Sequence, residues 1–322
     1  MTKILFLTES REDYLADSIL HGLISLGLDI VDYPKKDILY SSYTPANIEI
    51  RGFGFSLYRL LPDRVVDRSN IIQRLQAGEF DLVILGQVWR QWGQLLDLAS
   101  WLKSTRVVIL DGDDDTRIFH HSLTRLRRYG LQRFPIRSGR CLYLKRELMD
   151  DPHHLTSSLC QIDTISFSIP SEKIRSPMPM NKSKRFANHC VDEEVASFCG
   201  LKSRYAFNSE SQYYDDLSDS RFAITTKRGG WDCLRHYEIA AAGCLPCIRQ
   251  LDLKPKFCAP HGLIPDVNCI AYSDCRDLLN KLDHIDNNSS TYQDLLHGAN
   301  LWVRSYTTRE VAARMLKTSL SR

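Results

Sequence analysis

The residues at the start of the segment 227–238 have the types and order that bind phosphate. Lys227 and Arg228 supply positive charge and lead directly into Gly229 and Gly230. Glycine lets the backbone approach a ligand closely. The first turn of a following helix also presents unpaired N–H groups and the positive end of the helix dipole. We therefore expect these residues to hold a phosphate group.

A second pair of charges follows within the same segment. Arg235 and Glu238 are three residues apart, so on a helix they share one face. The guanidinium would meet a phosphate, and the carboxylate would accept hydrogen bonds from vicinal hydroxyls, so the pair suits the two ends of a nucleotide sugar. The alternative is a surface ion pair that contributes about 0.2–0.5 kcal/mol to the helix.

The surrounding residues predict a strand, a glycine turn, a helix and a second strand. The apolar, β-branched residues 222–226 suit a buried strand. Asp232 suits the N-cap of a helix that Gly243 ends, and residues 244–248 suit the next strand. The charged residues therefore gather at the carboxyl end of a strand, where open α/β sheets bind their ligands.

The pattern Arg235-x-x-Glu238-x-x-Ala-x-Gly243, continued by Cys-Leu-Pro-x-Ile, resembles the donor-binding segment of GT-B glycosyltransferases. It is most similar to the exostosin-like and CgeB-like groups. The resemblance implies that Glu238 holds the ribose of a nucleotide sugar, that the loop and its basic residues hold the diphosphate, and that no metal cofactor is required. Many members carry another glutamate where this chain has Trp231, and Asp232 is our candidate to replace it.

An acidic cluster follows another expected strand, at residues 106–110. It reads Asp111-Gly-Asp113-Asp114-Asp115, and carboxylates at a strand end hold a cation or act as a base. Three interpretations stay open. The acids cap a following helix; or Asp111, Asp113 and Asp114 supply the general base for an acceptor hydroxyl; or the cluster binds Mg²⁺ or Mn²⁺, as in the GT-A glycosyltransferases.

The ten cysteines are scattered along the chain. The N-terminus has no signal-peptide pattern, so we expect all of them to be free thiols that pack as small apolar residues. Cys244-x-x-Cys247 has redox or zinc spacing, but it lies in an expected strand and lacks a second ligand pair. Core packing is therefore the favoured interpretation.

The composition suits a globular protein of two domains. The chain has 322 residues, 43% of them hydrophobic, and a net charge of +3, which is too small to indicate nucleic-acid binding. The proline-rich residues 171–185 suit a linker. They divide the chain into an N-terminal Rossmann-like acceptor-side domain, 1–170, and a C-terminal nucleotide-sugar-binding domain, 186–322.

Several further segments carry expectations about structure. Residues 34–68 predict an irregular insertion beside the acceptor, and residues 164–169 predict a strand. The basic side chains of residues 124–146 suggest a solvated face. Tyr213 suits packing or the stacking of a base. Residues 292–319 predict a long helix, broken near Thr307, that crosses back to the first domain.

We therefore predict an α/β protein with two Rossmann-like domains facing a central cleft, as in GT-B enzymes. The predicted function is transfer of a hexosyl or related sugar from a nucleotide sugar to a hydroxyl of a glycan or lipid-linked acceptor, in cytoplasmic polysaccharide biosynthesis. Peripheral membrane contact is expected only with a lipid-linked acceptor. The alternatives are a metal-dependent transferase that uses the Asp111–Asp115 cluster, and a non-catalytic nucleotide-sugar-binding protein of the same fold.

Overall fold

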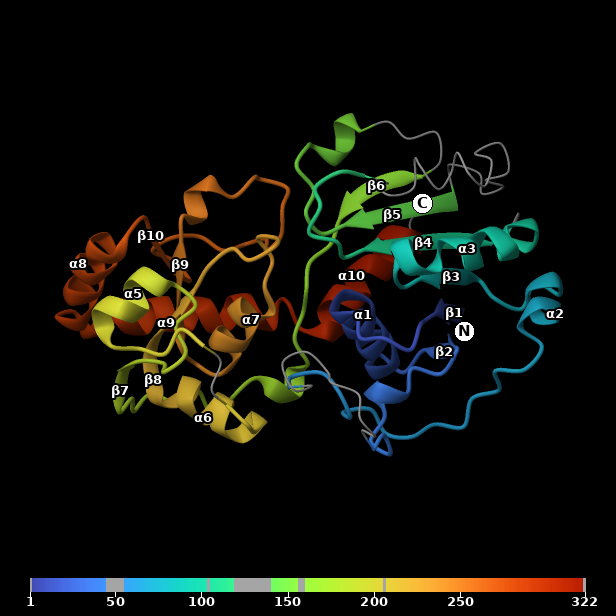
Figure 1. Ribbon diagram of the computed structural model, residues 1–322. Helices are drawn as coiled ribbons and strands as arrows, with labels where there is room; N and C mark the ends of the chain where they lie inside the picture. The colour runs from blue at the N-terminus through green and yellow to red at the C-terminus, as the bar shows by residue number, and fades with distance from the viewer. Residues whose placement is uncertain are drawn as a thin grey trace.

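The computed structural model describes residues 2–44, 55–102, 105–118, 140–155, 160–204 and 207–320. The described strands form two parallel sheets, one of six strands and one of four. Each sheet lies in its own half of the molecule and is covered by helices (Figure 1). Among the described residues, no helix is both long enough and apolar enough to cross a membrane.

The six-stranded sheet forms the N-terminal half. Its strands lie in the order β2-β1-β3-β4-β5-β6, and all neighbours are parallel. The order changes direction between β1 and β3, and such sheets bind ligands at the carboxyl ends of the strands beside that point. The strands are β1 (Lys3–Leu7), β2 (Asp29–Tyr33), β3 (Leu82–Leu85), β4 (Arg106–Asp111), β5 (Cys141–Lys145) and β6 (Gln161–Thr164).

Helices α1 and α10 pack side by side against this sheet (Figure 1). The Asp13 carboxylate caps α1 by accepting a backbone N–H. Gly22 permits the close contact, because a Cβ at this position would overlap the backbone of Thr308. The helices of this half within the described residues are α1 (Tyr14–Ser25), α2 (Ile71–Gln76), α3 (Val88–Leu98) and α10 (Thr308–Leu320).

The four-stranded sheet forms the C-terminal half, with its parallel strands in the order β10-β9-β8-β7. Its strands are β7 (Lys184–Phe186), β8 (Ser220–Thr225), β9 (Leu245–Arg249) and β10 (Ile270–Tyr272). Its helices are α5 (Glu193–Cys199), α6 (Glu210–Asp219), α7 (Leu234–Ala241), α8 (Cys275–Asp286) and α9 (Ser289–Arg304). As predicted, α7 is followed by Gly243 in a left-handed conformation, with φ of 73°.

The two halves are joined by two segments that lie beside each other. Residues 165–169 lead out of the six-stranded sheet, and the turn between α9 and α10 leads back to it. The N–H of Ile169 donates to the carbonyl of Tyr306 at 3.1 Å, and the N–H of Thr308 donates to the carbonyl of Ile169 at 2.9 Å. The break expected near Thr307 is therefore confirmed, and α10 returns to the N-terminal half.

The strand predicted at residues 164–169 is wrong. The strand β6 spans Gln161–Thr164, and the residues after it form the first crossing segment. The apolar residues Ile165, Phe167 and Ile169 occupy every second position, as they would in a half-buried strand. In the structure they contact the hydrophobic clusters of both halves, and the serines between them are buried as well. The alternation of residue types therefore misled the sequence interpretation.

The expectation that every cysteine is a free thiol is also wrong. Cys141 and Cys160 form a disulfide. Cys141 begins β5 and Cys160 directly precedes β6, and these two strands are neighbours in the sheet. The pairing depends on strand order, which the sequence does not state. Cys244 and Cys247 are buried free thiols, as expected for core packing.

Candidate active site

A cleft with a volume of about 850 Å³ lies between the two halves. Its N-terminal wall is built from the segments that follow β1, β3 and β4, at the carboxyl ends of the strands beside the change in strand order. Its C-terminal wall is the turn between β8 and α7, including Arg228, Gly229, Gly230 and Asp232. The cleft therefore occupies the position at which parallel α/β sheets bind their ligands.

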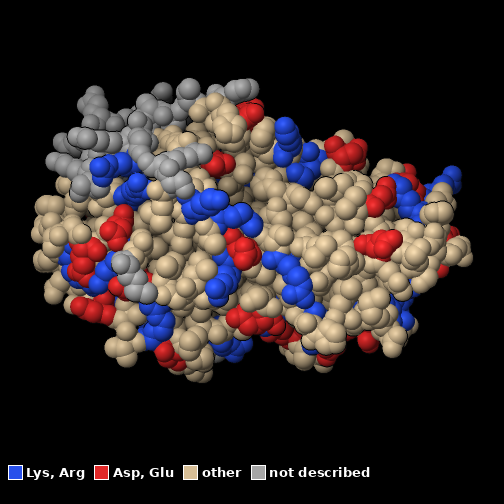
Figure 2. All heavy atoms as spheres, turned by 180° about the vertical axis from the view of Figure 1, so that it is seen from behind, with Lys and Arg blue, Asp and Glu red and all other residues tan. Residues whose placement is uncertain are grey.

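Figure 2 shows the charges on one face of the molecule. Lys and Arg side chains gather near the middle of this face, with Asp and Glu side chains beside them. Within the cleft itself the lining also carries both signs, with Arg11, Arg90 and Arg228 among the cations and Asp113 and Asp114 among the acids. A ligand with both an anionic part and hydroxyl groups would suit this mixture.

The glycine turn is approached from the N-terminal half by two carboxylates. A Cβ at Gly229 would overlap the carboxylate of Asp114, and a Cβ at Gly230 would overlap that of Glu147. The carboxylate of Glu147 accepts the N–H groups of Trp231 and Asp232, each at 3.0 Å. The close approach of the buried Glu147 therefore requires glycine at position 230, and backbone N–H groups of this turn already bind an anionic group.

Arg146 lies at the centre of the contact between the halves. It follows β5, and its side chain is only 1% exposed. It pairs with Glu147 at 2.6 Å and with Asp114, and it donates to the backbone carbonyl of Asp232 at 2.7 Å. Its guanidinium also lies over the ring of Phe167, 4.5 Å from the centroid. The solvated basic face expected at residues 124–146 is therefore wrong for this residue, because its charge is compensated inside the protein, and residues 124–139 of that segment lie outside the described residues.

Arg235 and Glu238 share a helix face, as predicted, and both contact Tyr213. Tyr213 donates its hydroxyl to Glu238 at 2.6 Å, and Arg235 donates Nη1 to the same hydroxyl oxygen at 3.2 Å. These residues line a cavity of about 200 Å³ together with Arg228 and Cys233, and Arg228 and Cys233 also line the cleft. The guanidinium of Arg235 is further held by the carbonyls of Ile224 and His189.

Glu238 is also contacted from the other half of the chain. Its side chain accepts the hydroxyl of Ser56, which in turn is 2.7 Å from the hydroxyl of Tyr214. Burial raises the pKa of Glu238, and the hydrogen bonds from Ser56 and Tyr213 and the charge of Arg235 oppose that rise. Ser56 belongs to the segment that we expected beside the acceptor. It contacts the residue predicted to bind the donor.

Asp232 does not cap the helix, contrary to the prediction. The N-cap of α7 is Cys233. The Asp232 carboxylate instead accepts the N–H of Phe167 at 2.7 Å and the hydroxyl of Tyr237 at 2.8 Å. Burial raises its pKa to about 6, against the lowering effect of Arg146. Asp232 is thus a buried link between the glycine turn and the first crossing segment.

The acidic cluster does not act as a unit. Asp111 is fully buried, where it pairs with Lys145 at 3.1 Å and accepts the hydroxyl of Tyr143. Burial raises its pKa, although Lys145 opposes the rise. Among the described residues it is not part of the cleft lining, whereas Asp113 and Asp114 are. Asp111 is therefore a structural residue, and its prediction as a candidate base is wrong.

The two other interpretations of this cluster, a helix cap and a metal site, have different outcomes. The helix expected after the acids falls on residues 119–139, outside the described residues. Within the described ranges, no three His, Cys, Asp or Glu side chains gather as metal ligands.

The two basic residues of the glycine turn, Lys227 and Arg228, are exposed. The amine of Lys227 is 5.3 Å from the ring centroid of Trp231.

The sequence interpretation missed Arg146, Glu147 and Ser56. A signal for the first two was present, because they directly follow a buried strand, and polar residues at strand ends build such sites. Ser56 carried no signal of this kind. Its contact with Glu238 joins positions 182 residues apart, and only the folded chain brings them together.

Solved structures with the same overall arrangement were found by comparison. HepE from Anabaena, determined with UDP and glucose, superimposes with a TM-score of 0.59 at 10% sequence identity over 100% of both chains. A glycosyltransferase from Rickettsia africae gives a TM-score of 0.55 at 10% identity, over 99% of this chain and 98% of that one. Sucrose-phosphate synthase from Thermosynechococcus elongatus gives 0.53 at 9% identity, with the same coverage.

The chain has the GT-B fold. This confirms the predicted fold class of two Rossmann-like halves facing a cleft. At such low identity the likeness concerns the fold alone. No protein-family model and no curated protein sequence matches the chain, so its place in the exostosin-like or CgeB-like group stays a prediction.

Proposed function

We propose that this protein is a glycosyltransferase that moves a sugar from a nucleotide sugar to a hydroxyl group of a glycan or lipid-linked acceptor. The observation that carries the proposal is the cavity in which Arg235, Tyr213 and Glu238 meet, beside the larger cleft of a GT-B fold. HepE was determined with UDP, with UDP-glucose, and with UDP and glucose. A uridine nucleotide is therefore the donor class to test first.

In this proposal Glu238 binds the ribose of the donor. One of its carboxylate oxygens accepts the hydroxyl of Ser56 and the other accepts that of Tyr213. Two hydroxyl donors on one carboxylate form the pattern that a vicinal diol would present. Donor binding would then replace the hydroxyl of Ser56 with a ribose hydroxyl, while Tyr213 stays in place.

The diphosphate would lie at the turn between β8 and α7. Lys227 and Arg228 are exposed there, and α7 begins at Leu234, directly after this turn, so the turn leads into the end of a helix that favours anions. Fixed positive groups at a leaving diphosphate stabilise the charge that develops in the transition state. No metal cofactor is part of this proposal, and Mg²⁺ or Mn²⁺ belongs only to the alternative mechanism.

A general base would have to face the acceptor hydroxyl from the N-terminal wall of the cleft. Asp113 and Asp114 line this wall. Asp114 is paired with Arg146, so its carboxylate is already bound by a cation. Asp113 is therefore the first candidate for the base if the sugar is transferred with inversion.

The donor site is tested by calorimetric titration of the full chain with UDP in the presence of a chelator. Glu238→Gln and Arg228→Met should each weaken binding about tenfold or more, because each removes a charge-assisted hydrogen bond worth about 1.5–3 kcal/mol. Glu193→Gln and Arg276→Met are matched controls on exposed helix positions, and they should bind as the wild type does. Equal affinity in all five proteins would disprove the site.

The same titration and an activity assay separate the alternatives. UDP affinity that survives the chelator contradicts the metal-dependent mechanism. Hydrolysis of UDP-glucose or of another nucleotide sugar, lost in Glu238→Gln, supports an enzyme. Binding without any turnover of nucleotide sugars would favour the non-catalytic binding protein.

A further inference from the structure

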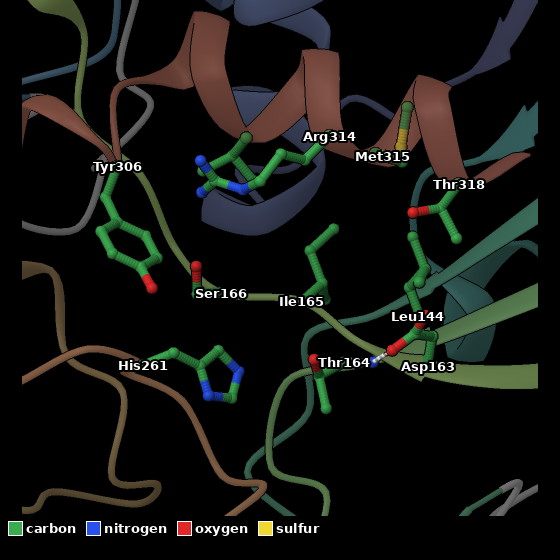
Figure 3. Close-up of a pocket in the computed structure, with 11 residues that line it drawn as sticks. Leu144, Asp163, Thr164, Ile165, Ser166, His261, Tyr306, Arg314, Met315 and Thr318 are labelled. Atoms are coloured by element: carbon green, nitrogen blue, oxygen red, sulfur yellow. Dashed lines mark hydrogen bonds between the residues drawn. The ribbon is translucent and has the colours of Figure 1, made fainter. Parts of the chain in front are cut away.

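A second cavity lies at the place where the chain crosses between its halves. It has a volume of about 220 Å³. Both connections contribute to it, the first through Ser166 and the second through Tyr306, and the loop with His261 closes one side (Figure 3). Its volume is below the roughly 300 Å³ at which drug-sized pockets begin, which limits an occupant to the size of a monosaccharide or a small organic acid.

The polar groups of this cavity come from separate elements and face a common space. Figure 3 shows the hydroxyls of Tyr306, Ser166 and Thr164 and the ring of His261 arranged around it, with the guanidinium of Arg314 on the side of α10. Leu144, Ile165 and Met315 supply an apolar wall. Small-molecule sites combine apolar walls with a few convergent polar groups in this way.

His261 gives a separate indication of a missing ligand. Its Nε2 is buried and has no hydrogen-bond partner among the described residues, and a buried polar group without a partner is costly. Burial, together with the positive charges of Lys254 and Arg314, lowers the pKa of His261 to about 4. The ring is therefore neutral near pH 7 and able to accept or donate one hydrogen bond.

Arg314 supplies the positive charge of the site. Its Nη1 donates to the carbonyl of Ser305 at 2.6 Å, and its guanidinium lies 5.0 Å from the ring centroid of Tyr306. These contacts hold the side chain at the mouth of the cavity. Asp163 also lines the cavity. Its carboxylate would accept hydrogen bonds from hydroxyl groups and would repel an anion placed beside it.

We propose that this cavity binds a small hydroxylated anion, either a sugar phosphate or a sugar acid. Arg314 binds the phosphate or carboxylate group. Asp163, Thr164 and His261 bind hydroxyl groups at the other end of the ligand. The site is separate from the donor cleft and does not depend on the proposed sugar-transfer activity.

The first crossing segment connects this cavity to the cleft. Ser166 lines the cavity and hydrogen-bonds the hydroxyl of Tyr237. The next residue, Phe167, lines the cleft and donates its N–H to Asp232, which also accepts the hydroxyl of Tyr237. An occupant of the cavity therefore contacts the same hydrogen-bond network that holds the glycine turn.

The experiment measures the melting temperature of the full chain with glucose 6-phosphate or gluconate. Glucose and inorganic phosphate serve as neutral and hydroxyl-free probes. At least one of the two hydroxylated anions should raise the melting temperature more than glucose or phosphate does. The better of the two identifies the anionic group, phosphate or carboxylate.

Variants then place the ligand. Arg314→Met should abolish the shift and Thr164→Val should reduce it, whereas Arg309→Met, an exposed arginine on the same helix, should retain it. Arg228→Met in the cleft should also retain it, which separates this site from the donor site. The proposal is overturned if neither anion raises the melting temperature, if Arg314→Met keeps the shift, or if Arg228→Met removes it.

Discussion

Each carboxylate near the cleft has its own set of hydrogen-bond donors or cationic partners, and these decide its role. Glu238 accepts two hydroxyls, Glu147 accepts two backbone N–H groups, and Asp111 is paired with a buried lysine. Residue type alone made Asp111 look equivalent to Asp113, yet one is buried at the end of β4 and the other lines the cleft. Burial and partners therefore decide which acid is available for chemistry.

Asp232 should make stability depend on pH. Burial raises its pKa from 3.8 to about 6 in the folded protein, so between these values the folded state binds more protons than the unfolded state. The free energy of unfolding therefore falls as pH rises through this range, by at most about 3 kcal/mol. In urea unfolding at pH 4 and pH 7, Asp232→Asn should lose less stability than the wild type on going to the higher pH. If the free energy of unfolding changes by the same amount in both proteins between pH 4 and pH 7, the raised pKa of Asp232 is contradicted.

The elements that carry the candidate site were largely predictable, because apolar periodicity is a local property. The strand, glycine turn, helix and strand around residues 222–248 were all found, as was the Rossmann-like architecture of the two halves. The failures concern relations between elements. The disulfide of Cys141 depends on the pairing of β5 with β6, and the role of Ile165 depends on where the chain crosses between the halves.

The glycine turn offers a prediction in which two adjacent residues should differ. Gly230→Ala places a Cβ against Glu147, whose buried carboxylate is fixed by two N–H groups and Arg146. Gly229→Ala places one against Asp114, whose side chain is 53% exposed and able to move. We expect Gly230→Ala to destabilise the protein by about 1–3 kcal/mol and to weaken UDP binding.

Gly229→Ala is the matched control for that prediction. It should stay within about 0.5 kcal/mol of the wild type, as surface substitutions do. Urea unfolding and calorimetric titration with UDP measure both effects. If the two variants behave alike, the tight approach of Glu147 to the turn is not a feature of the protein in solution.

The whole molecule is held together by contacts that lie on both sides of the cleft. Arg146 and Glu147 join the end of β5 to the glycine turn, and α10 returns the chain end to α1. An antiparallel β-bridge also pairs the backbone of Glu147 with that of Cys258 in the C-terminal half. Residues of both halves line the cleft, so a ligand that enters it contacts both halves at once.

Arg146→Met should uncouple the two halves. The change removes the ion pairs to Glu147 and Asp114 and the hydrogen bond to the carbonyl of Asp232, and it leaves the buried carboxylate of Glu147 without its cationic partner. Breaking a buried pair in this way costs about 3–5 kcal/mol. Calorimetric unfolding of the variant should therefore show a lower melting temperature, and two transitions where the wild type shows one.

Arg276→Met on the exposed face of α8 is the control, with an expected change of no more than about 0.5 kcal/mol. UDP or a nucleotide sugar should restore part of the lost stability of Arg146→Met, because a ligand that binds only the folded state stabilises it by mass action. Melting of Arg146→Met in a single transition, at the temperature of the control, would show that the halves are held together without this residue.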